Sequence, residues 1–195
     1  MRKLRIAVDL DGVLADTITS FCKILNKRYS THFTVESFDR WNAWQNAGIS
    51  QNEFLGTLDE AWLDWRSIQA MEENLSEKVG KLAAFGQVDI VTGRSLHTVQ
   101  YAKAWLKEQH IPFDTFIRTQ STNAKVKLSY DLFVDDSPDL MALIASTLDS
   151  HGILYTQPWN RITPEMPRIV RVQRWNEIPP VLEEMVGKDR TRSSK

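Results

Sequence analysis

The sequence has a single cysteine, no long apolar run and a formal net charge of only −1. Cys22 alone cannot form an internal disulfide, and we expect it to be a small buried side chain. The first apolar stretch is short and contains Arg5 and Asp9, so we expect neither a signal peptide nor a membrane span. The balanced charge gives no reason to expect a nucleic acid polymer or a membrane as partner. These absences favour a soluble, cytoplasmic protein of one large domain, or one domain with an insertion.

Two carboxylates follow the first apolar run of the chain. The run Leu4–Val8 is rich in β-branched residues and stops at Asp9, Asp11 and Gly12, which predicts a buried strand. Where the chain leaves the strand, both acids can turn into one crevice, and they repel each other unless a cation or a shared proton intervenes. The pair therefore indicates a divalent metal, although Asp-Gly after a strand is by itself more often only a turn.

The rest of the chain predicts an α/β fold with a Rossmann-like parallel sheet and helices on both faces. Helical periodicity covers residues 16–29, 35–44, 51–57, 75–85, 99–106, 138–148 and 181–186. Short apolar runs predict strands at residues 88–91, 115–117, 132–134, 152–155 and 169–172. The strands alternate with helices in the manner of βα units.

Residues 15–71 differ in character from the rest, because they hold four of the seven tryptophans and show no strand-like alternation. We expect them to form a small helical insertion after the first strand. The predicted core domain then comprises residues 1–14 and 72–187, and residues 188–195 are predicted to be a disordered tail.

Three predicted strand ends carry the groups suited to chemistry. Besides the first acid pair these are Thr92, after the second strand, and Asp135 with Asp136, after a later one. Parallel neighbouring strands bring their carboxyl ends together, so these groups can share one crevice. Lys125 lies ten positions before Asp135. Thr92 by itself could equally be an ordinary strand-end threonine.

This order of motifs resembles the haloacid dehalogenase-like hydrolases over nearly the whole core. The matching pieces are Asp9-Leu10-Asp11-Gly12-Val13, Val91-Thr92-Gly93, Lys125 and Val134-Asp135-Asp136-Ser137-Pro138-Asp139. Each piece is weak alone, and their common order carries the resemblance. It implies a phosphomonoester hydrolase that acts on a small molecule and uses Mg²⁺.

The resemblance also implies roles for single residues. Asp9 would be the nucleophile that forms an aspartyl-phosphate, and Asp11 the general acid and base. Thr92 with Gly93 would bind the phosphoryl oxygens, and Lys125 would supply positive charge. Lys127 competes with Lys125 for that role, although the family spacing favours Lys125.

The same resemblance implies the ligands of Mg²⁺. They would be Asp9, the backbone carbonyl of Asp11 and Asp136, with Asp135 acting through water. The choice between Asp135 and Asp136 stays open. Arg94 could either pair with the phosphate or cap the following helix.

The tryptophan-rich insertion and the run Gln157–Arg161 resemble one branch, the 5′(3′)-deoxyribonucleotidases, in which a small helical cap covers the site. This implies hydrolysis of a nucleoside monophosphate. An aromatic cap could stack a base, and the candidate residues are Phe21, Trp41, Trp44, Trp62 and Trp65. The spacing of the tryptophans, three residues apart in each pair, equally fits the apolar core of the cap itself.

Two other functions remain open: a phosphatase of another small ester such as a sugar phosphate, and a non-catalytic nucleotide-binding protein. A polynucleotide 3′-phosphatase is less attractive because the net charge of −1 does not suit a polyanion. The sequence also leaves a homodimer open.

Overall fold

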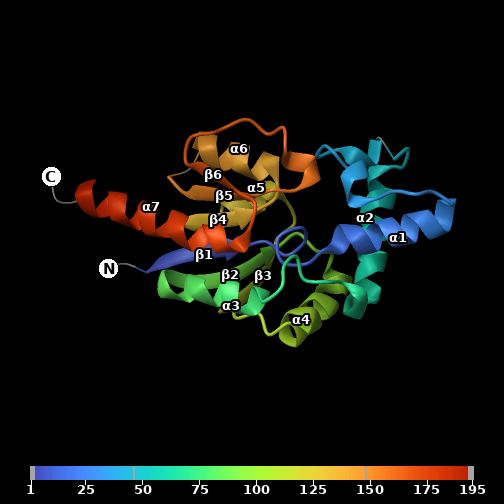
Figure 1. Cartoon of the computed structure of the whole chain (residues 1–195), viewed down its shortest axis with the longest axis horizontal. Helices are drawn as coiled ribbons and strands as arrows, with labels where there is room; N and C mark the ends of the chain where they lie inside the picture. The colour runs from blue at the N-terminus through green and yellow to red at the C-terminus, as the bar shows by residue number, and fades with distance from the viewer. Residues whose placement is uncertain (1–2, 46, 148, 193–195) are drawn as a thin grey trace.

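The structure, a computed structural model, describes residues 3–45, 47–147 and 149–192. Its centre is a six-stranded parallel sheet in the order β3-β2-β1-β4-β5-β6 (Figure 1). The strands are β1 (Leu4–Val8), β2 (Gly86–Thr92), β3 (Thr115–Arg118), β4 (Leu132–Asp135), β5 (His151–Tyr155) and β6 (Ile169–Val172). The predicted α/β class and the five predicted later strands are confirmed.

Helices cover both faces of this sheet. α3 (Leu75–Gly80), α4 (Val99–Glu108) and α7 (Ile178–Arg192) pack on one face, and α5 (Thr122–Val126) and α6 (Pro138–Thr147) pack on the other; α1 (Thr17–Tyr29) and α2 (Gln51–Leu63) lie in the segment between β1 and α3. On β1, Ile6 and Val8 belong to the core cluster shared with α3, α4 and α7, whereas Ala7 belongs to the cluster shared with α6. This alternation follows from the two-residue period of a strand and explains why β1 is apolar on both sides. None of the helices in the described part of the chain is long and apolar enough to cross a membrane.

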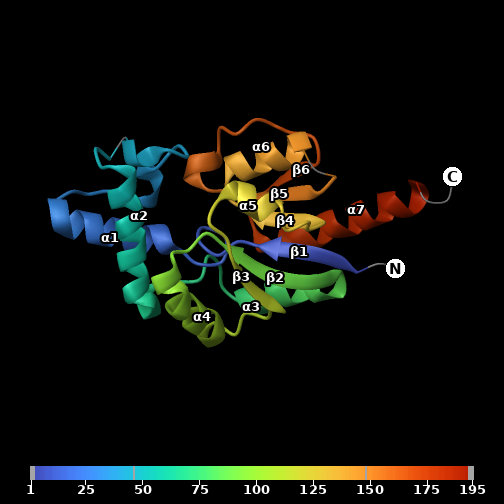
Figure 2. The ribbon, with the colours of Figure 1, turned by 180° about the vertical axis from the view of Figure 1, so that it is seen from behind.

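The helical segment between β1 and α3 leaves the core and returns to it at one place. Ala15 and Ala70 form an antiparallel bridge, and the backbone N–H of Met71 donates to the carbonyl of Leu14 at 2.8 Å. Beyond this bridge α1 and α2 cross each other at one end of the molecule, past the carboxyl ends of the strands (Figures 1 and 2). We call residues 15–71 the helical segment.

The helical segment differs in detail from the helices expected there. Residues 35–44 are not one helix but contain the 3-10 turns η1 (Val35–Ser37) and η2 (Ala43–Gln45). Phe38 between them is buried against Phe21, so tertiary packing overrides the helical periodicity. The helix expected at 51–57 continues to Leu63, because the buried residues Leu58, Ala61 and Trp62 extend its apolar face past Gly56.

The end of the chain also differs from the expectation. Helix α7 runs to Arg192, so residues 188–192 are helical rather than part of a tail. Lys188 and Arg190 are good helix formers and prolong the helix that the apolar residues Ile178 and Leu182 anchor on the core. Residues 193–195, and Leu148 at the end of another predicted helix, lie outside the described residues.

The strand order places β1 between β2 and β4, where the direction of chain progression reverses. Such a switch point is where open α/β sheets bind their ligands, outside the carboxyl ends of the strands. The backbone N–H of Asp9 donates to the carbonyl of Val134 at 2.9 Å, so the ends of β1 and β4 are joined side by side. The fold thus brings the two acidic motifs of the sequence to one point.

Candidate active site

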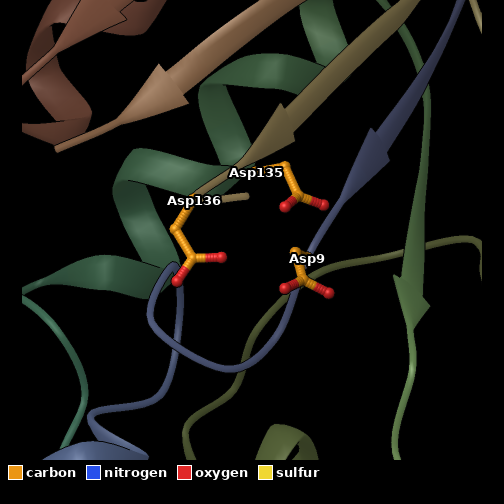
Figure 3. Close-up of side chains that lie close together, drawn as sticks. All are labelled: Asp9, Asp135 and Asp136. Carbon is orange, nitrogen blue, oxygen red and sulfur yellow. The ribbon is translucent and has the colours of Figure 1, made fainter. Parts of the chain in front are cut away.

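Three carboxylates meet at the ends of β1 and β4. Asp9, Asp135 and Asp136 each offer an oxygen, and these oxygens lie within 4.8 Å of one another. Figure 3 shows Asp9 and Asp135 following adjacent strands, with Asp136 one residue further along the chain and all three carboxylates around a common space. Asp135 and Asp136 are buried, and only 13% of the Asp9 side chain is exposed. The sequence predicts Asp9, Asp135 and Asp136 in one crevice, but the carboxylate of Asp11, which it pairs with Asp9, is not part of this cluster.

Lys125 supplies the balancing positive charge. Its ammonium group lies 2.9 Å from Oδ1 of Asp9 and 2.5 Å from Oδ2 of Asp135. Helix α5 presents it, and Ser121 caps this helix by accepting from the N–H of Ala124. Lys127, the alternative raised by the sequence, is exposed at the end of the same helix. The structure therefore brings Lys125, and not Lys127, to the acidic cluster.

The acidic cluster holds more carboxylates than positively charged groups, and the pKa values of its residues reflect this. Burial raises the pKa of Asp9 to about 7, with Lys125 opposing and Asp135 reinforcing the shift. Burial, together with Asp135 and Asp9, holds the pKa of Asp136 well above its usual range. Burial alone would lower the pKa of Lys125, but Asp135 and Asp9 outweigh it and raise that pKa. One ammonium group does not neutralise three carboxylates.

The residues of this cluster fit a divalent cation. The donor set is entirely carboxylate oxygen, which suits Mg²⁺. Both oxygens of Asp135 are already engaged, one by Lys125 and the other by the N–H of Ser137 at 2.9 Å. Among the described residues no donor is bonded to Oδ1 of Asp136 or to Oδ2 of Asp9. Asp9 and Asp136, the ligands that the family resemblance implies, are thus better placed than Asp135 for direct contact with a cation.

Asp11 lies beside the cluster and is held by three different partners. Its Oδ1 accepts from the hydroxyl of Thr17 at 2.6 Å and from the indole N–H of Trp62 at 2.8 Å. Its Oδ2 lies 2.9 Å from Nε of Arg94. Thr17 and Trp62 belong to the helical segment, and Arg94 follows β2. Asp11 therefore sits where the helical segment and the core meet.

Arg94, Gly93 and Thr92 follow one another at the end of β2, and all three line the same cavity as the acids. The guanidinium of Arg94 also reaches the helical segment, at 3.4 Å from Asp59 and 3.3 Å from the carbonyl of Leu58. It therefore neither caps the following helix nor stands free in the cavity. Thr92 accepts from the N–H of Arg94, and a side chain at Gly93 would meet no atom within 4 Å. The backbone at Gly93 is open to the cavity.

The cavity has a volume of about 680 Å³ and is lined by the acids of the core domain and by aromatic residues of the helical segment. Trp41 and Trp44 line it, as the sequence predicts for contacts to a planar group. Phe21 does not: it is fully buried behind Phe38 and Phe54, which line the wall in its place. Phe21 therefore supports the wall and does not present a surface to the cavity.

The other two tryptophans considered for stacking also lie elsewhere. Trp62 is fully buried and packs edge-on against Trp105, with ring centroids 6.2 Å apart. Trp65 packs on the same core cluster and carries the guanidinium of Arg66 over its ring. This pair packs, as the alternative to stacking has it, but on the core domain and not within the apolar cluster of the helical segment itself.

Several cavity residues were missed by the sequence interpretation. They are Phe38, Arg40, Asn42, Gln51, Phe54 and the run Thr119–Thr122. The run 119–122 follows β3. Because the sequence indicated this strand only weakly, the position of these residues at a strand end did not mark them as candidates for the site. Trp159 was noted, and the structure places its indole N–H 3.0 Å from Oδ2 of Asp136.

Solved structures with the same fold come from several proteins. A haloacid dehalogenase-like hydrolase from Streptococcus pneumoniae is 12% identical, with a TM-score of 0.63 over 90% of this chain and 96% of that one. A predicted phosphoglycolate phosphatase from Haemophilus somnus is 15% identical, with a TM-score of 0.61 over 93% and 98%. Protein tyrosine kinase A of Mycobacterium tuberculosis is 12% identical, with a TM-score of 0.64 over 93% and 99%. At these identities the likeness establishes the fold.

The sequence itself matches one protein family over nearly its full length. No curated protein sequence matches the chain. The family model for "5′ nucleotidase, deoxy (Pyrimidine), cytosolic type C protein" matches residues 2–189, which include the strand-end acids, Lys125 and the whole helical segment. The chain therefore belongs to this family of deoxy 5′-nucleotidases and is a phosphomonoester hydrolase.

Proposed function

We propose that this protein hydrolyses nucleoside monophosphates to nucleoside and phosphate through an aspartyl-phosphate on Asp9, with Mg²⁺ bound at the acidic cluster. One observation carries the proposal: the carboxylate of Asp9 lies 2.9 Å from Lys125, belongs to the acidic cluster and lines the aromatic-walled cavity. Family membership supports the reaction class, and the geometry supports the assignment of residues.

The reaction has two balanced steps. In the first, an oxygen of Asp9 forms a bond to phosphorus while the bond from phosphorus to the ester oxygen breaks, and Asp11 gives that oxygen a proton. In the second, Asp11 takes a proton from water, whose oxygen bonds to phosphorus as the bond to Asp9 breaks. Lys125 balances charge on the nucleophile and the phosphoryl group. Thr92 and the open backbone of Gly93 are placed to bind phosphoryl oxygens.

Asp9, Asp136 and the backbone carbonyl of Asp11 would hold Mg²⁺, with Asp135 in the surrounding layer. A bound divalent cation supplies positive charge that draws the phosphate dianion to a carboxylate it would otherwise repel. Without such charge, burial keeps the pKa of Asp9 near 7, so a good part of this nucleophile would be protonated at neutral pH. Lys125, together with the charge that a bound cation would supply, would keep Asp9 ionised.

The cavity supports a nucleoside as the leaving group. Its volume of about 680 Å³ is within the usual range for small-molecule sites, roughly 300–1,000 Å³. Trp41 and Trp44 form an aromatic wall away from the acids, suited to a planar base. We propose that the helical segment is the cap that closes this cavity and that Trp41 and Trp44 contact the base. Small phosphates without a base could use the acidic end alone.

The test is phosphate release across a matched panel, with Mg²⁺ and with EDTA. The panel holds dUMP, dTMP, dGMP, their ribo- and 3′-phosphate counterparts, and 2-deoxyribose 5-phosphate, which is dUMP without its base. We expect metal-dependent turnover that is fastest on deoxynucleotides. Asp9→Asn should abolish it while the variant still folds and melts in one cooperative transition. Faster turnover of sugar phosphates would reject the nucleotide assignment, and no turnover of any ester would favour a binding protein.

A further inference from the structure

The turn after β5 forms hydrogen bonds to both the side chain and the backbone of Asp136, one of the candidate metal ligands. The indole N–H of Trp159 donates to Oδ2 of Asp136 at 3.0 Å. The side-chain amide of Asn160 donates to the backbone carbonyl of Asp136 at 2.9 Å and to that of Tyr155 at 2.8 Å. The turn therefore fixes both the carboxylate and the backbone of Asp136.

The same turn also holds the loop after β1. Gln157 donates from its side chain to the carbonyl of Gly12 at 2.6 Å. Gly12 has φ +74°, and a Cβ built there would lie 2.4 Å from Oδ2 of Asp136 and 3.0 Å from the ring of Trp159. Gly12 is therefore required both for its backbone conformation and for the close approach of Asp136. Three segments distant in sequence meet at this carboxylate.

The turn is itself rigidly supported. Asn160 is fully buried, and Arg171 on β6 donates to its side-chain oxygen at 3.1 Å and to its backbone carbonyl at 3.0 Å. The Trp159 ring packs in an apolar cluster with Phe21 and Phe38 of the helical segment and is 8% exposed. The indole N–H cannot turn away from Asp136 without breaking this packing.

We propose that Trp159 is a positioning residue that occupies one oxygen of Asp136, so that the carboxylate offers only Oδ1 to a divalent cation. The inference rests on the metal site of the proposed function and deepens it. A carboxylate limited to one oxygen suits Mg²⁺, which takes near-octahedral geometry with single-oxygen contacts. It disfavours Ca²⁺, which takes more ligands and often both oxygens of a carboxylate. Trp159 thus contributes to the choice of metal without touching it.

The test compares Mg²⁺ and Ca²⁺ binding to the whole chain by calorimetry, without substrate. Trp159→Phe keeps an aromatic ring in the cluster, although a smaller one, and removes the N–H donor. We expect its Mg²⁺ affinity to fall roughly 10-fold or more, as is usual when a partner of a metal ligand is lost. Its Ca²⁺ affinity should be unchanged or higher because Oδ2 of Asp136 is then free. Trp159→His, which retains a ring N–H, should recover part of the preference for Mg²⁺.

The matched control is Trp105→Phe. Trp105 is also buried and donates its indole N–H to the carbonyl of Ile68 at 2.9 Å, outside the acidic cluster. It should bind both cations like the wild type. An unchanged Mg²⁺ affinity in Trp159→Phe, or an equal loss for both cations, would overturn the positioning role while leaving the proposed function intact. Asp136→Asn should bind no Mg²⁺. A wild-type chain that also bound none would overturn both the positioning role and the proposed function.

Discussion

Trp62 of the helical segment donates its indole N–H to the carboxylate of Asp11, at 2.8 Å, across the boundary with the core. The carboxylate is also 2.9 Å from Arg94, whose guanidinium reaches back to Asp59 on α2. The proposed general acid is therefore held by groups from both parts of the chain. Its orientation depends on how the helical segment sits on the core.

This relationship predicts that Trp62→Phe slows the chemical step. The ring of phenylalanine keeps much of the packing against Trp105, while Asp11 loses one donor. A hydrogen bond to a charged group is worth about 1.5–3 kcal/mol, and losing roughly half of this at the transition state would lower kcat about 4- to 13-fold. KM should change little. Steady-state kinetics on dUMP check this, with Trp105→Phe as the control for lost packing. An equal loss of kcat in both variants would remove Asp11 positioning as the cause.

Lys125 and Lys127 provide a matched pair of variants. Lys125→Met leaves Asp9 and Asp135 buried without their partner, which should destabilise the metal-free protein by ~3–5 kcal/mol. It should also lower kcat about 10²-fold or more through lost transition-state charge stabilisation. Mg²⁺ should restore part of the stability because it supplies positive charge at the same carboxylates. Lys127→Met, at an exposed position of the same helix, should resemble the wild type in melting and kinetics. A larger defect in Lys127→Met would reverse the assignment.

The pKa of Asp9 predicts a link between pH and the effect of Mg²⁺. Burial raises this pKa to about 7, so between its ordinary value and 7 the folded metal-free protein holds a proton that the unfolded chain has lost. Stability of the metal-free protein should therefore fall as pH rises through this window. Mg²⁺ needs the ionised carboxylates, so it should raise the melting temperature more at pH 8 than at pH 6. Equal increments at the two pH values would contradict this. Asp9→Asn should weaken the pH dependence.

The positions of the acids follow from the sequence because a strand has a fixed two-residue period and parallel strands end on one edge. That reasoning placed Asp9, Asp135 and Asp136 in one site, and the family resemblance added Lys125. It could not place the aromatic residues, because the i, i+3 spacing of the tryptophans describes a helix face without saying what the face meets. Trp41 and Trp44 lie on 3-10 turns and loops facing the cavity, and Trp62 faces the core. Long-range packing, such as Phe38 covering Phe21, decides these positions.

The aromatic wall gives the last prediction, which separates base recognition from phosphate recognition. Trp41→Ala and Trp44→Ala should each raise the KM for dUMP, since stacking on a base is worth about 1–3 kcal/mol. The KM for 2-deoxyribose 5-phosphate, which lacks only the base, should stay the same. Phe21→Leu is the matched control: it alters the same apolar cluster from behind the wall and should cost stability without changing the ratio of the two KM values. If the KM values for both substrates rise equally in Trp41→Ala and Trp44→Ala, the tryptophans shape the cavity and do not recognise the base.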